Sequence, residues 1–276
     1  MKCYEEQYCS ILKDIMENGT EELNERTGVK TKRLANQIIQ VDLQKEFPIL
    51  RSRQVFWKSA IEEILWIMQA QSNNIKDLRP HIWDKWASED GSIGKSYGYQ
   101  VSKPVHTTQG GVNVTYDSQV HYVLQTLKRD PSDRRCVINL WDCEELSEMN
   151  LNPCCFSSVW NLDGGKLNCL LTQRSGDYPV GVVFNTTQYA ALTILFANEL
   201  KVEPGNLLHV IADAHIYENQ YEGAYKILDN YEKLSFKMDK PAKLVAPHKR
   251  FWDVTIEDIL LENYEHMGKI NFEVTK

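Results

Sequence analysis

Two adjacent cysteines, Cys154 and Cys155, are the side chains with the clearest capacity for covalent chemistry. A cysteine thiolate can attack an electron-poor carbon and form a covalent intermediate. The pair follows Pro153, which cannot sit in the interior of a central strand and so predicts a strand edge or a turn, where a thiol is partly exposed. Two small core residues are the alternative interpretation, since buried inert thiols are common.

Four arginines could supply positive charge near such a thiol: Arg26, Arg134, Arg135 and Arg174. Each one alone is typical of a solvated surface charge. Together they could form a phosphate clamp, because several forked guanidinium donors match the oxygens of a phosphate, and their field would favour the thiolate form of Cys154. The sequence allows either interpretation, because it does not show whether the four side chains converge.

Glu63 is the carboxylate that the sequence places in the least polar surroundings. On a helix its same-side neighbours are Phe56, Ala60 and Ile67, so it is expected to lie within apolar surface. Burial would raise its pKa and let it carry protons near neutral pH. We favour this role over that of a buried carboxylate satisfied by backbone or water.

Asp213, His215 and Tyr217 follow a continuous apolar run and alternate along the chain. In an extended strand they lie on one face, because side chains alternate with period two. This arrangement suits a hydroxyl-rich ligand such as a ribose, and a polar layer at a sheet edge is the alternative. No zinc site is expected, because no second histidine or cysteine lies at ligand spacing.

Asn185 and three aromatic residues could bind a flat heterocycle. Asn185 precedes a helical pattern, so it is either an N-cap or a reader of a base edge, for which a carboxamide offers both a donor and an acceptor. Trp83, Trp86 and Tyr97 are typical of a core, or could stack against the ring.

The elements that must position these side chains alternate between helical and strand patterns. We expect a sheet packed against helices, of the α/β (α+β) class. The expected elements are a helix ending at Asn18-Gly19, a buried helix over residues 54–69, strands 158–162 and 166–173 joined by Gly164-Gly165, a helix over 187–200, a turn at Pro204-Gly205-Asn206, and a strand over 207–212.

The chain has 276 residues, of which 42% are hydrophobic, and a single domain over residues 1–276 is expected. Its apolar stretches are shorter than the roughly 20 residues that a bilayer crossing needs, and its N-terminus lacks a signal pattern, so a soluble cytoplasmic protein is expected. Seven cysteines without a CxxC pair predict reduced thiols. A net charge of −7 argues against bulk nucleic-acid binding.

The order and spacing of these motifs resemble the thymidylate synthase family. The core motifs are Pro153-Cys154, Gln173-Arg174-Ser175-Gly176-Asp177, Gly181 with Phe184-Asn185, and Asp213-Ala214-His215-Ile216-Tyr217. Outside that core, Arg26-Thr27-Gly28, Glu63-Ile64-Leu65-Trp66, Ile82-Trp83-Asp84-Lys85-Trp86, Tyr97-Gly98 and Arg134-Arg135 also match. The resemblance therefore covers nearly the whole chain.

The resemblance implies a mechanism. Cys154 would add to C6 of dUMP, and C5 would then attack the methylene of 5,10-methylenetetrahydrofolate. Loss of the C5 proton and hydride transfer from the folate would give dTMP and dihydrofolate. The folate would be both carbon donor and reductant, and no metal is implied.

The resemblance also implies a role for each site residue. The catalytic residues would be Cys154, Glu63, Tyr97, Asp177 and Asn185. The dUMP-binding residues would be Arg26, Arg174, Ser175, Asn185, His215 and Tyr217, with Arg134 and Arg135 donated by the other subunit of a homodimer that packs sheet to sheet. The folate-binding residues would be Arg53, Trp83, Trp86, Asp177 and Gly181.

The chain departs from the family at several positions. Cys155 replaces a histidine that many members carry, Gln220 replaces another, and the chain ends in Lys276, where the family has a small apolar residue that helps to close the site over folate. A leaky site could admit water, so a nucleotide hydroxymethylase of the same fold is the closest alternative. A catalytically silent nucleotide-binding homologue is less favoured, because such a protein has no use for Cys154.

Overall fold

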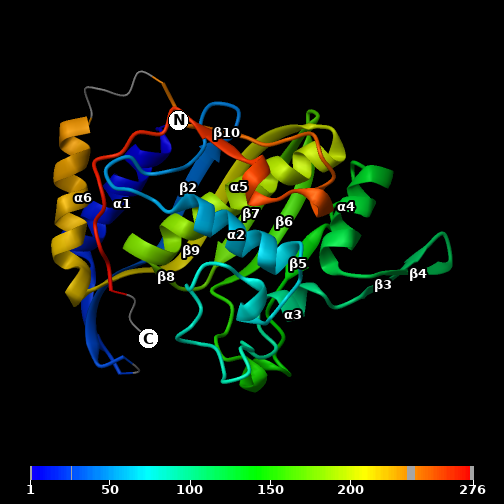
Figure 1. Ribbon diagram of the computed structural model, residues 1–276, viewed down its shortest axis with the longest axis horizontal. Helices are drawn as coiled ribbons and strands as arrows, with labels where there is room; N and C mark the ends of the chain where they lie inside the picture. The colour runs from blue at the N-terminus through cyan, green and yellow to red at the C-terminus, as the bar shows by residue number, and fades with distance from the viewer. Residues whose placement is uncertain (1, 26, 235–239, 274–276) are drawn as a thin grey trace.

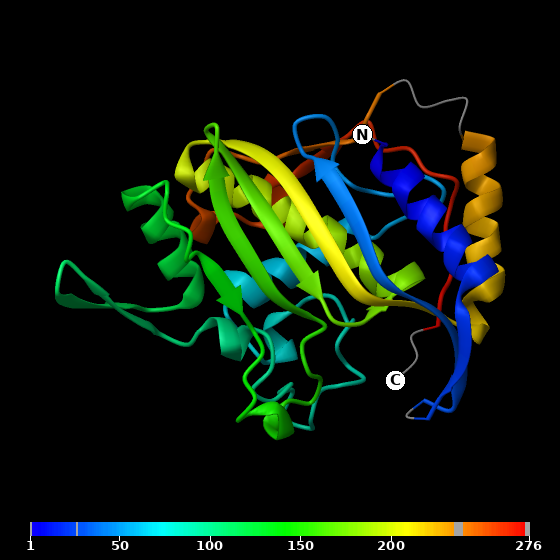
Figure 2. The ribbon, with the colours of Figure 1, turned by 180° about the vertical axis from the view of Figure 1, so that it is seen from behind.

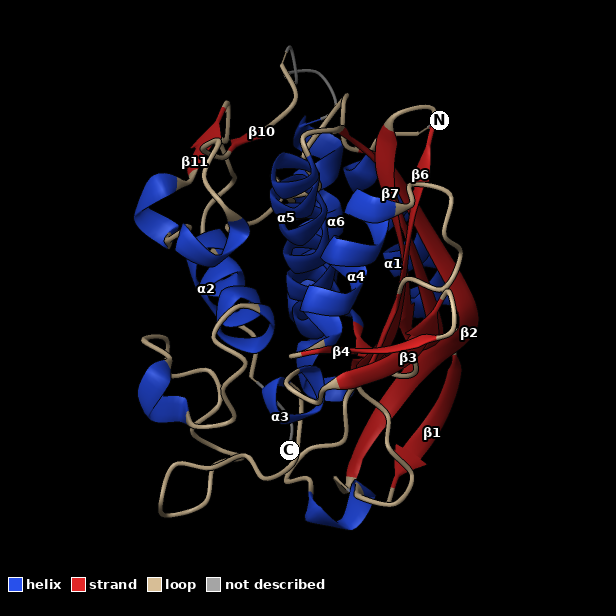
Figure 3. Cartoon of the chain, turned by 90° about the vertical axis from the view of Figure 1, so that its right-hand side faces the viewer, coloured by secondary structure: helices blue, strands red, loops and turns tan. Residues whose placement is uncertain are grey.

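The computed structural model describes residues 2–25, 27–234 and 240–273, in which a mixed β-sheet packs against helices (Figures 1 and 3). The helices are α1 (Tyr4–Asn18), α2 (Trp57–Met68), α3 (Gly98–Val101), α4 (Gln119–Arg129), α5 (Val183–Leu200) and α6 (Tyr221–Leu234). The strands are β1 (Thr20–Asn24), β2 (Val29–Asp42), β3 (Val105–Gln109), β4 (Val112–Tyr116), β5 (Val137–Asn139), β6 (Cys155–Asp163), β7 (Lys166–Gln173), β8 (Gly176–Asp177), β9 (Glu203–Tyr217), β10 (Lys243–Val245) and β11 (Leu260–Glu262). This architecture confirms the expected fold class.

The main sheet has the strand order β1-β2-β9-β7-β6-β5, with β8 paired to β9 beyond the end of β7. β7 and β8 run parallel to β9, and the other pairs in this sheet are antiparallel. The parallel pair β7 and β9 is joined through α5, as a crossover connection requires. The carboxyl ends of β7 and β9 therefore meet at the same edge of the sheet.

Helix α5 forms the centre of the core between the sheet and α2. It is apolar on all sides, and most of its residues are buried. Its Phe196 ring lies 4.8 Å from the ring of Trp160 on β6 and 4.9 Å from that of Phe251. In the described residues, only the segment Tyr178–Leu200 is long and apolar enough to cross a membrane, and 72% of its apolar window is buried inside the protein, which is typical of a core helix.

Several expected elements are confirmed. Helix α1 ends at Asn18, and Gly19 caps it with a hydrogen bond to the Ile15 carbonyl. Gly164 and Gly165 join β6 to β7 with φ angles of 56° and 77°. Two consecutive positive φ angles are what a tight hairpin turn between twisted strands requires.

Other expectations were wrong. Pro204-Gly205-Asn206 is not a turn but belongs to β9, where Pro204 pairs with Leu167 of β7. Helix α2 begins only at Trp57, and Phe56 before it is 47% exposed, so it does not help to bury Glu63. Helix α5 begins at Val183, which places Asn185 inside the helix and rules out an N-cap role.

The face of the main sheet that points away from α5 is open (Figure 2). Apolar side chains form a row across it, because Val137 pairs with Val159, Val159 with Leu170, and Leu170 with Leu208 in adjacent strands. Ile38 on β2 continues this face and is 55% exposed. A contiguous apolar surface of this kind is typical of an interaction site.

Candidate active site

A cavity of about 1220 Å³ opens at the edge of the sheet where β7 and β9 end and the antiparallel β6 begins. The predicted site residues that line it are Arg53, Glu63, Trp83, Trp86, Tyr97, Cys154, Arg174, Ser175, Asp177, Gly181, Asn185, His215 and Tyr217. The fold thus brings side chains from distant parts of the sequence to one space, which is large enough for more than one small molecule.

Two of the predicted arginines do not reach this cavity within their own chain. Arg134 and Arg135 are exposed just before β5, and Arg135 forms an ion pair of 3.2 Å with Asp133. Arg26 and the terminal residue Lys276 lie outside the described residues. Of the four arginines expected around a phosphate, the described part of one chain therefore brings only Arg174 to the cavity.

Cys154 lies in the bend directly before β6 and is half-buried at the cavity wall. Its backbone N–H donates to the hydroxyl of Tyr97 over 3.0 Å. Tyr97 has a φ of 27°, which is unusual for a residue with a side chain and typical of functional sites. Cys155 is buried within β6, and burial raises the pKa of its thiol well above the ordinary value. Of the two adjacent thiols, only that of Cys154 lines the cavity.

Arg174 follows the end of β7 and holds the segment that carries Cys154. Its Nε donates to the Pro153 carbonyl over 3.0 Å, and its Nη2 donates to the Asn152 carbonyl over 2.8 Å. The same Nη2 lies 3.8 Å from the Cys154 Sγ. A guanidinium at this distance favours the negatively charged form of a thiol and fixes its direction.

Glu63 projects from α2 into the cavity and is bound by two N–H donors. Trp83 Nε1 donates to one carboxylate oxygen over 2.9 Å, and Gln188 Nε2 donates to the other over 2.8 Å. Removal from water raises the pKa of Glu63 to about 7, although both donors act in the opposite direction. A carboxyl group with this pKa can accept and release protons at neutral pH.

Asn185 belongs to a chain of buried amides that ends at Glu63. Its Oδ1 accepts from Gln173 Nε2 over 3.1 Å, and its Nδ2 donates to Gln188 Oε1 over 3.0 Å. His209 on β9 continues the chain, with its Nε2 2.7 Å from Gln173 Oε1. Sequence reasoning missed Gln173, Gln188 and His209 as contacts of the site. Gln173 stood in the motif around Arg174, and Gln188 is three residues after Asn185, which is the spacing of one helix face once α5 is known to begin at Val183.

Two buried polar atoms at the cavity have no hydrogen-bond partner within the described residues, namely Asp177 Oδ1 and Arg53 Nε. The other Asp177 oxygen accepts from Gln220 Nε2 over 2.9 Å, and burial raises the pKa of the Asp177 carboxyl. The Arg53 guanidinium lies over the Phe272 ring, 5.1 Å from its centre. Buried polar atoms are normally paired, so these two are suited to a ligand that offers one acceptor and one donor.

The polar residues at the end of β9 face the cavity together, as expected. His215 Nδ1 lies 2.9 Å from one Asp213 oxygen, and Arg33 Nη1 contacts the other at 2.9 Å. Arg33 on β2 also lines the cavity and was not predicted, because it joins the site only through the β2–β9 pairing. In the described ranges, no three His, Cys, Asp or Glu side chains are grouped so as to hold a metal ion.

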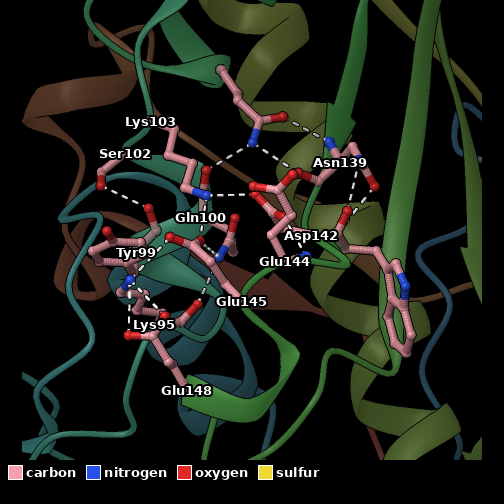
Figure 4. A network of polar contacts seen from close by, with 12 residues as sticks. Lys95, Tyr99, Gln100, Ser102, Lys103, Asn139, Asp142, Glu144, Glu145 and Glu148 are labelled. Atoms are coloured by element: carbon pink, nitrogen blue, oxygen red, sulfur yellow. Dashed lines mark hydrogen bonds and ion pairs between the residues drawn. The ribbon is translucent and has the colours of Figure 1, made fainter.

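A polar network ties the segments on both sides of α3 to residues 142–148 (Figure 4). Lys95 and Lys103 both form ion pairs with the Glu145 carboxylate, the first at 3.1 Å. Tyr97 lies between these two lysines in sequence, so both flanks of the segment that carries it are tied to Glu145.

Comparison with known proteins identifies consistent relatives. The family model described as "Thymidylate synthase" matches residues 6–276. A thymidylate synthase of Clostridium beijerinckii is 43% identical, with 100% of both chains covered, and thymidylate synthase 1 of Bacillus subtilis is 37% identical, with 99% of both covered. The solved structure of a thermostable thymidylate synthase A from Bacillus subtilis superposes with a TM-score of 0.88 at 34% identity, covering 100% of each chain.

Proposed function

Because the chain belongs to the thymidylate synthase family, we propose that it converts dUMP to dTMP in this cavity, using methylenetetrahydrofolate, within one catalytic domain over residues 1–276. The observation that carries this proposal is the Cys154 thiol at the cavity wall, 3.8 Å from the Arg174 guanidinium. A cytoplasmic location fits such an enzyme of nucleotide biosynthesis.

Cys154 is the nucleophile. Its Sγ forms a bond to C6 of the pyrimidine, and the electron pair of the C5–C6 double bond moves toward O4, which makes C5 nucleophilic. C5 then forms a bond to the one-carbon unit of the folate. Loss of the C5 proton breaks the bond between this carbon and the folate nitrogen and leaves an exocyclic methylene. Hydride transfer from the folate to this methylene re-forms the C5–C6 double bond and expels the Cys154 thiolate from C6. Glu63 and Tyr97 line the route of the C5 proton, and the Glu63 pKa of about 7 suits the transfer.

The dUMP-binding residues lie around the nucleophile. Arg174 and Ser175 bind the phosphate, together with Arg26, while Asn185 reads the uracil edge. His215 and Tyr217 bind the ribose hydroxyl. In support, Asn185 retains one N–H and one Oδ1 lone pair beyond its two amide contacts, which matches the acceptor O4 and the donor N3–H of uracil.

The folate-binding residues are Asp177, Arg53, Gly181, Trp83 and Trp86. The unpaired Asp177 Oδ1 accepts from the pterin, and the unpaired Arg53 Nε donates to the co-substrate. Gly181 leaves room for close approach, since an added Cβ would meet no atom nearer than 3.7 Å. Methylenetetrahydrofolate supplies both the one-carbon unit and the hydride. The two indoles give the site apolar walls that help to exclude water.

The enzyme acts as a homodimer that packs through the open face of the sheet. The apolar row from Val137 to Leu208 gives this face a surface suited to an identical partner. In support, Arg134 and Arg135 are exposed and directly precede this apolar row in the chain. They enter the partner's cavity and complete its phosphate site.

The test is to incubate the enzyme with dUMP and methylenetetrahydrofolate and to follow the absorbance of dihydrofolate. We expect dTMP and dihydrofolate in equal amounts, and no product from Cys154→Ser. Cys143→Ser is the matched control, because Cys143 is exposed and does not line the cavity. Mass spectrometry should find 5-fluoro-dUMP bound to Cys154 in the presence of folate.

Two results would refute this proposal. Hydroxymethyl-dUMP formed without dihydrofolate would identify a hydroxymethylase. Absence of the fluorinated adduct at Cys154 would identify a catalytically silent protein.

A further inference from the structure

Gln188 is the one residue that connects the base-facing amide directly with the carboxylate of Glu63 among the described residues. It lies on α5, is 2% exposed, and uses both ends of its side chain. Its Oε1 accepts from Asn185 over 3.0 Å, and its Nε2 donates to Glu63 over 2.8 Å. The orientation of the Gln188 side chain therefore affects both the base-facing amide of Asn185 and the carboxylate of Glu63.

Gln173, the amide farthest from Glu63, fixes the orientation of every amide in this hydrogen-bonded chain. Gln173 Nε2 lies 3.0 Å from the Ser175 backbone carbonyl, which can only accept, so the NH₂ group of Gln173 must point this way. The same NH₂ group faces Asn185, which must present its oxygen there and its own NH₂ group to Gln188. Gln188 in turn must present its NH₂ group to Glu63. Each amide has only one orientation that satisfies both of its neighbours.

His209 lies at the far end of this chain. Its burial lowers the pKa of the ring to about 3, so the ring is neutral and carries one proton. Gln173 presents its oxygen to Nε2 over 2.7 Å, so the proton is on Nε2. The Thr186 hydroxyl, 3.0 Å from Nδ1, donates its proton to the Val182 carbonyl over 2.7 Å. The amide chain therefore has one polarity from Gln173 to the cavity.

This polarity favours the ionised form of Glu63. Both of its carboxylate oxygens face N–H donors, one from Trp83 and one from Gln188. If the Glu63 oxygen near Gln188 carried a proton, its O–H would face the Gln188 NH₂ group, and two donors would meet. If the Gln188 amide were reversed to avoid this, its NH₂ group would face the NH₂ group of Asn185 instead. Tyr97 and Cys155 are the titratable groups that interact with Glu63, and burial raises the pKa of each well above its ordinary value, so both are neutral.

We propose that Gln188 is a positioning residue that keeps Glu63 ionised and holds the Asn185 amide in the orientation that accepts uracil and rejects cytosine. Cytosine presents a donor where uracil presents O4 and an acceptor where uracil presents N3–H, so it fits only a reversed Asn185 amide. That reversal would place like atoms together at both Gln173 and Gln188. The inference rests on the proposed conversion of dUMP.

The test compares wild type with Gln188→Met and Gln188→Glu, with Thr193→Val as the matched control. Methionine fills a similar volume but makes neither hydrogen bond. Glutamate still accepts from Asn185 but no longer supplies an N–H to Glu63. Thr193 is fully buried on the same helix, donates to the helix backbone and does not line the cavity, so its loss perturbs packing alone.

We expect Gln188→Met to move the acidic limb of the kcat profile upward by about one pH unit, because Glu63 loses a donor that stabilises its charge. Gln188→Glu should move it further, because a second carboxyl group then faces Glu63 and adds like-charge repulsion. Gln188→Met should also lower the ratio of the dCMP to the dUMP dissociation constant by about tenfold, since one of the two contacts that oppose reversal of the Asn185 amide is lost. Gln188→Glu should leave that ratio near the wild-type value. Thr193→Val should change neither quantity.

A pH profile of Gln188→Met that coincides with that of wild type would overturn the inference, and so would an equal shift in Thr193→Val. Circular dichroism checks that each variant is folded, and if Gln188→Met is not, the profile of Gln188→Glu decides in the same way. A wild-type protein that forms no dihydrofolate would instead refute the proposed function, so the two failures can be told apart.

Discussion

His209 makes the stability of this protein sensitive to acid. The ring is fully buried, and its pKa is lowered from 6.5 to about 3. Because the unfolded chain takes up the proton near pH 6.5 and the folded chain does not, stability from this group is complete above pH 6.5 and falls as the pH decreases toward 3. Between pH 7.5 and 5, 1.5 pH units lie below 6.5, which at 1.36 kcal/mol per unit gives a loss of about 2 kcal/mol.

We expect His209→Gln to remove this loss. Urea unfolding at pH 7.5 and pH 5, at one fixed protein concentration, gives the change in the free energy of unfolding for each protein. Other groups also titrate in this window, and burial of Glu63 acts with the opposite sign. The informative quantity is therefore the difference between variant and wild type, in which unchanged groups cancel. His106→Gln is the control, because this ring is exposed. Equal pH dependence in His209→Gln and wild type would refute the reasoning.

Two further predictions concern packing beside the site and the contacts of Arg174. Gly176→Ala should destabilise the protein by about 1–3 kcal/mol, because the new Cβ would lie 2.5 Å from a Val182 methyl carbon. Gly181→Ala should not destabilise it, because the new Cβ would meet no atom nearer than 3.7 Å. Thermal unfolding of the two variants tests this difference. Arg174→Lys should lower kcat/KM for dUMP by about tenfold or more and should slow the reaction of Cys154 with iodoacetamide. The reason is that one ammonium group cannot replace the forked contacts of the guanidinium. An unchanged rate of reaction with iodoacetamide would contradict this role of Arg174.

Local features of the fold could be predicted because their signals are contained in short segments. At the end of α1, Gly19 is needed because a Cβ there would overlap the Ile15 carbonyl oxygen. The hairpin at Gly164-Gly165 depends on the positive φ angles that glycine adopts freely. The turn expected at Pro204 was wrong because its cause lies far away in sequence. Pairing with β7 extends β9 through a segment that has the composition of a turn. Asn185 was misplaced because a π-helical turn, Tyr178–Val182, leads directly into α5, and this irregular geometry has no simple sequence pattern.

The residues that line the cavity were largely predictable from their motifs, but their mutual contacts were not. The apolar surroundings of Glu63 were readable from helical spacing, yet its two N–H donors come from a separate loop and from α5. The contact between His209 and Gln173 depends on the β7–β9 register, and that of Arg33 with Asp213 on the β2–β9 register. A register between strands far apart in sequence is decided by tertiary packing, which a single sequence does not display.

The pairing of β2 with β9 also has a consequence for synthesis of the chain. It joins Thr31–Asp42 to Asn206–Tyr217, so β2 is synthesised long before the strand with which it pairs. Contacts of such long sequence separation form slowly and leave strand edges unprotected in the meantime. A nascent chain that stops before β9 lacks both this partner and the residues His215 and Tyr217. On the proposed roles of these two residues, nucleotide binding requires the chain at least through the end of β9, and shorter translation products are expected to aggregate rather than to compete for dUMP.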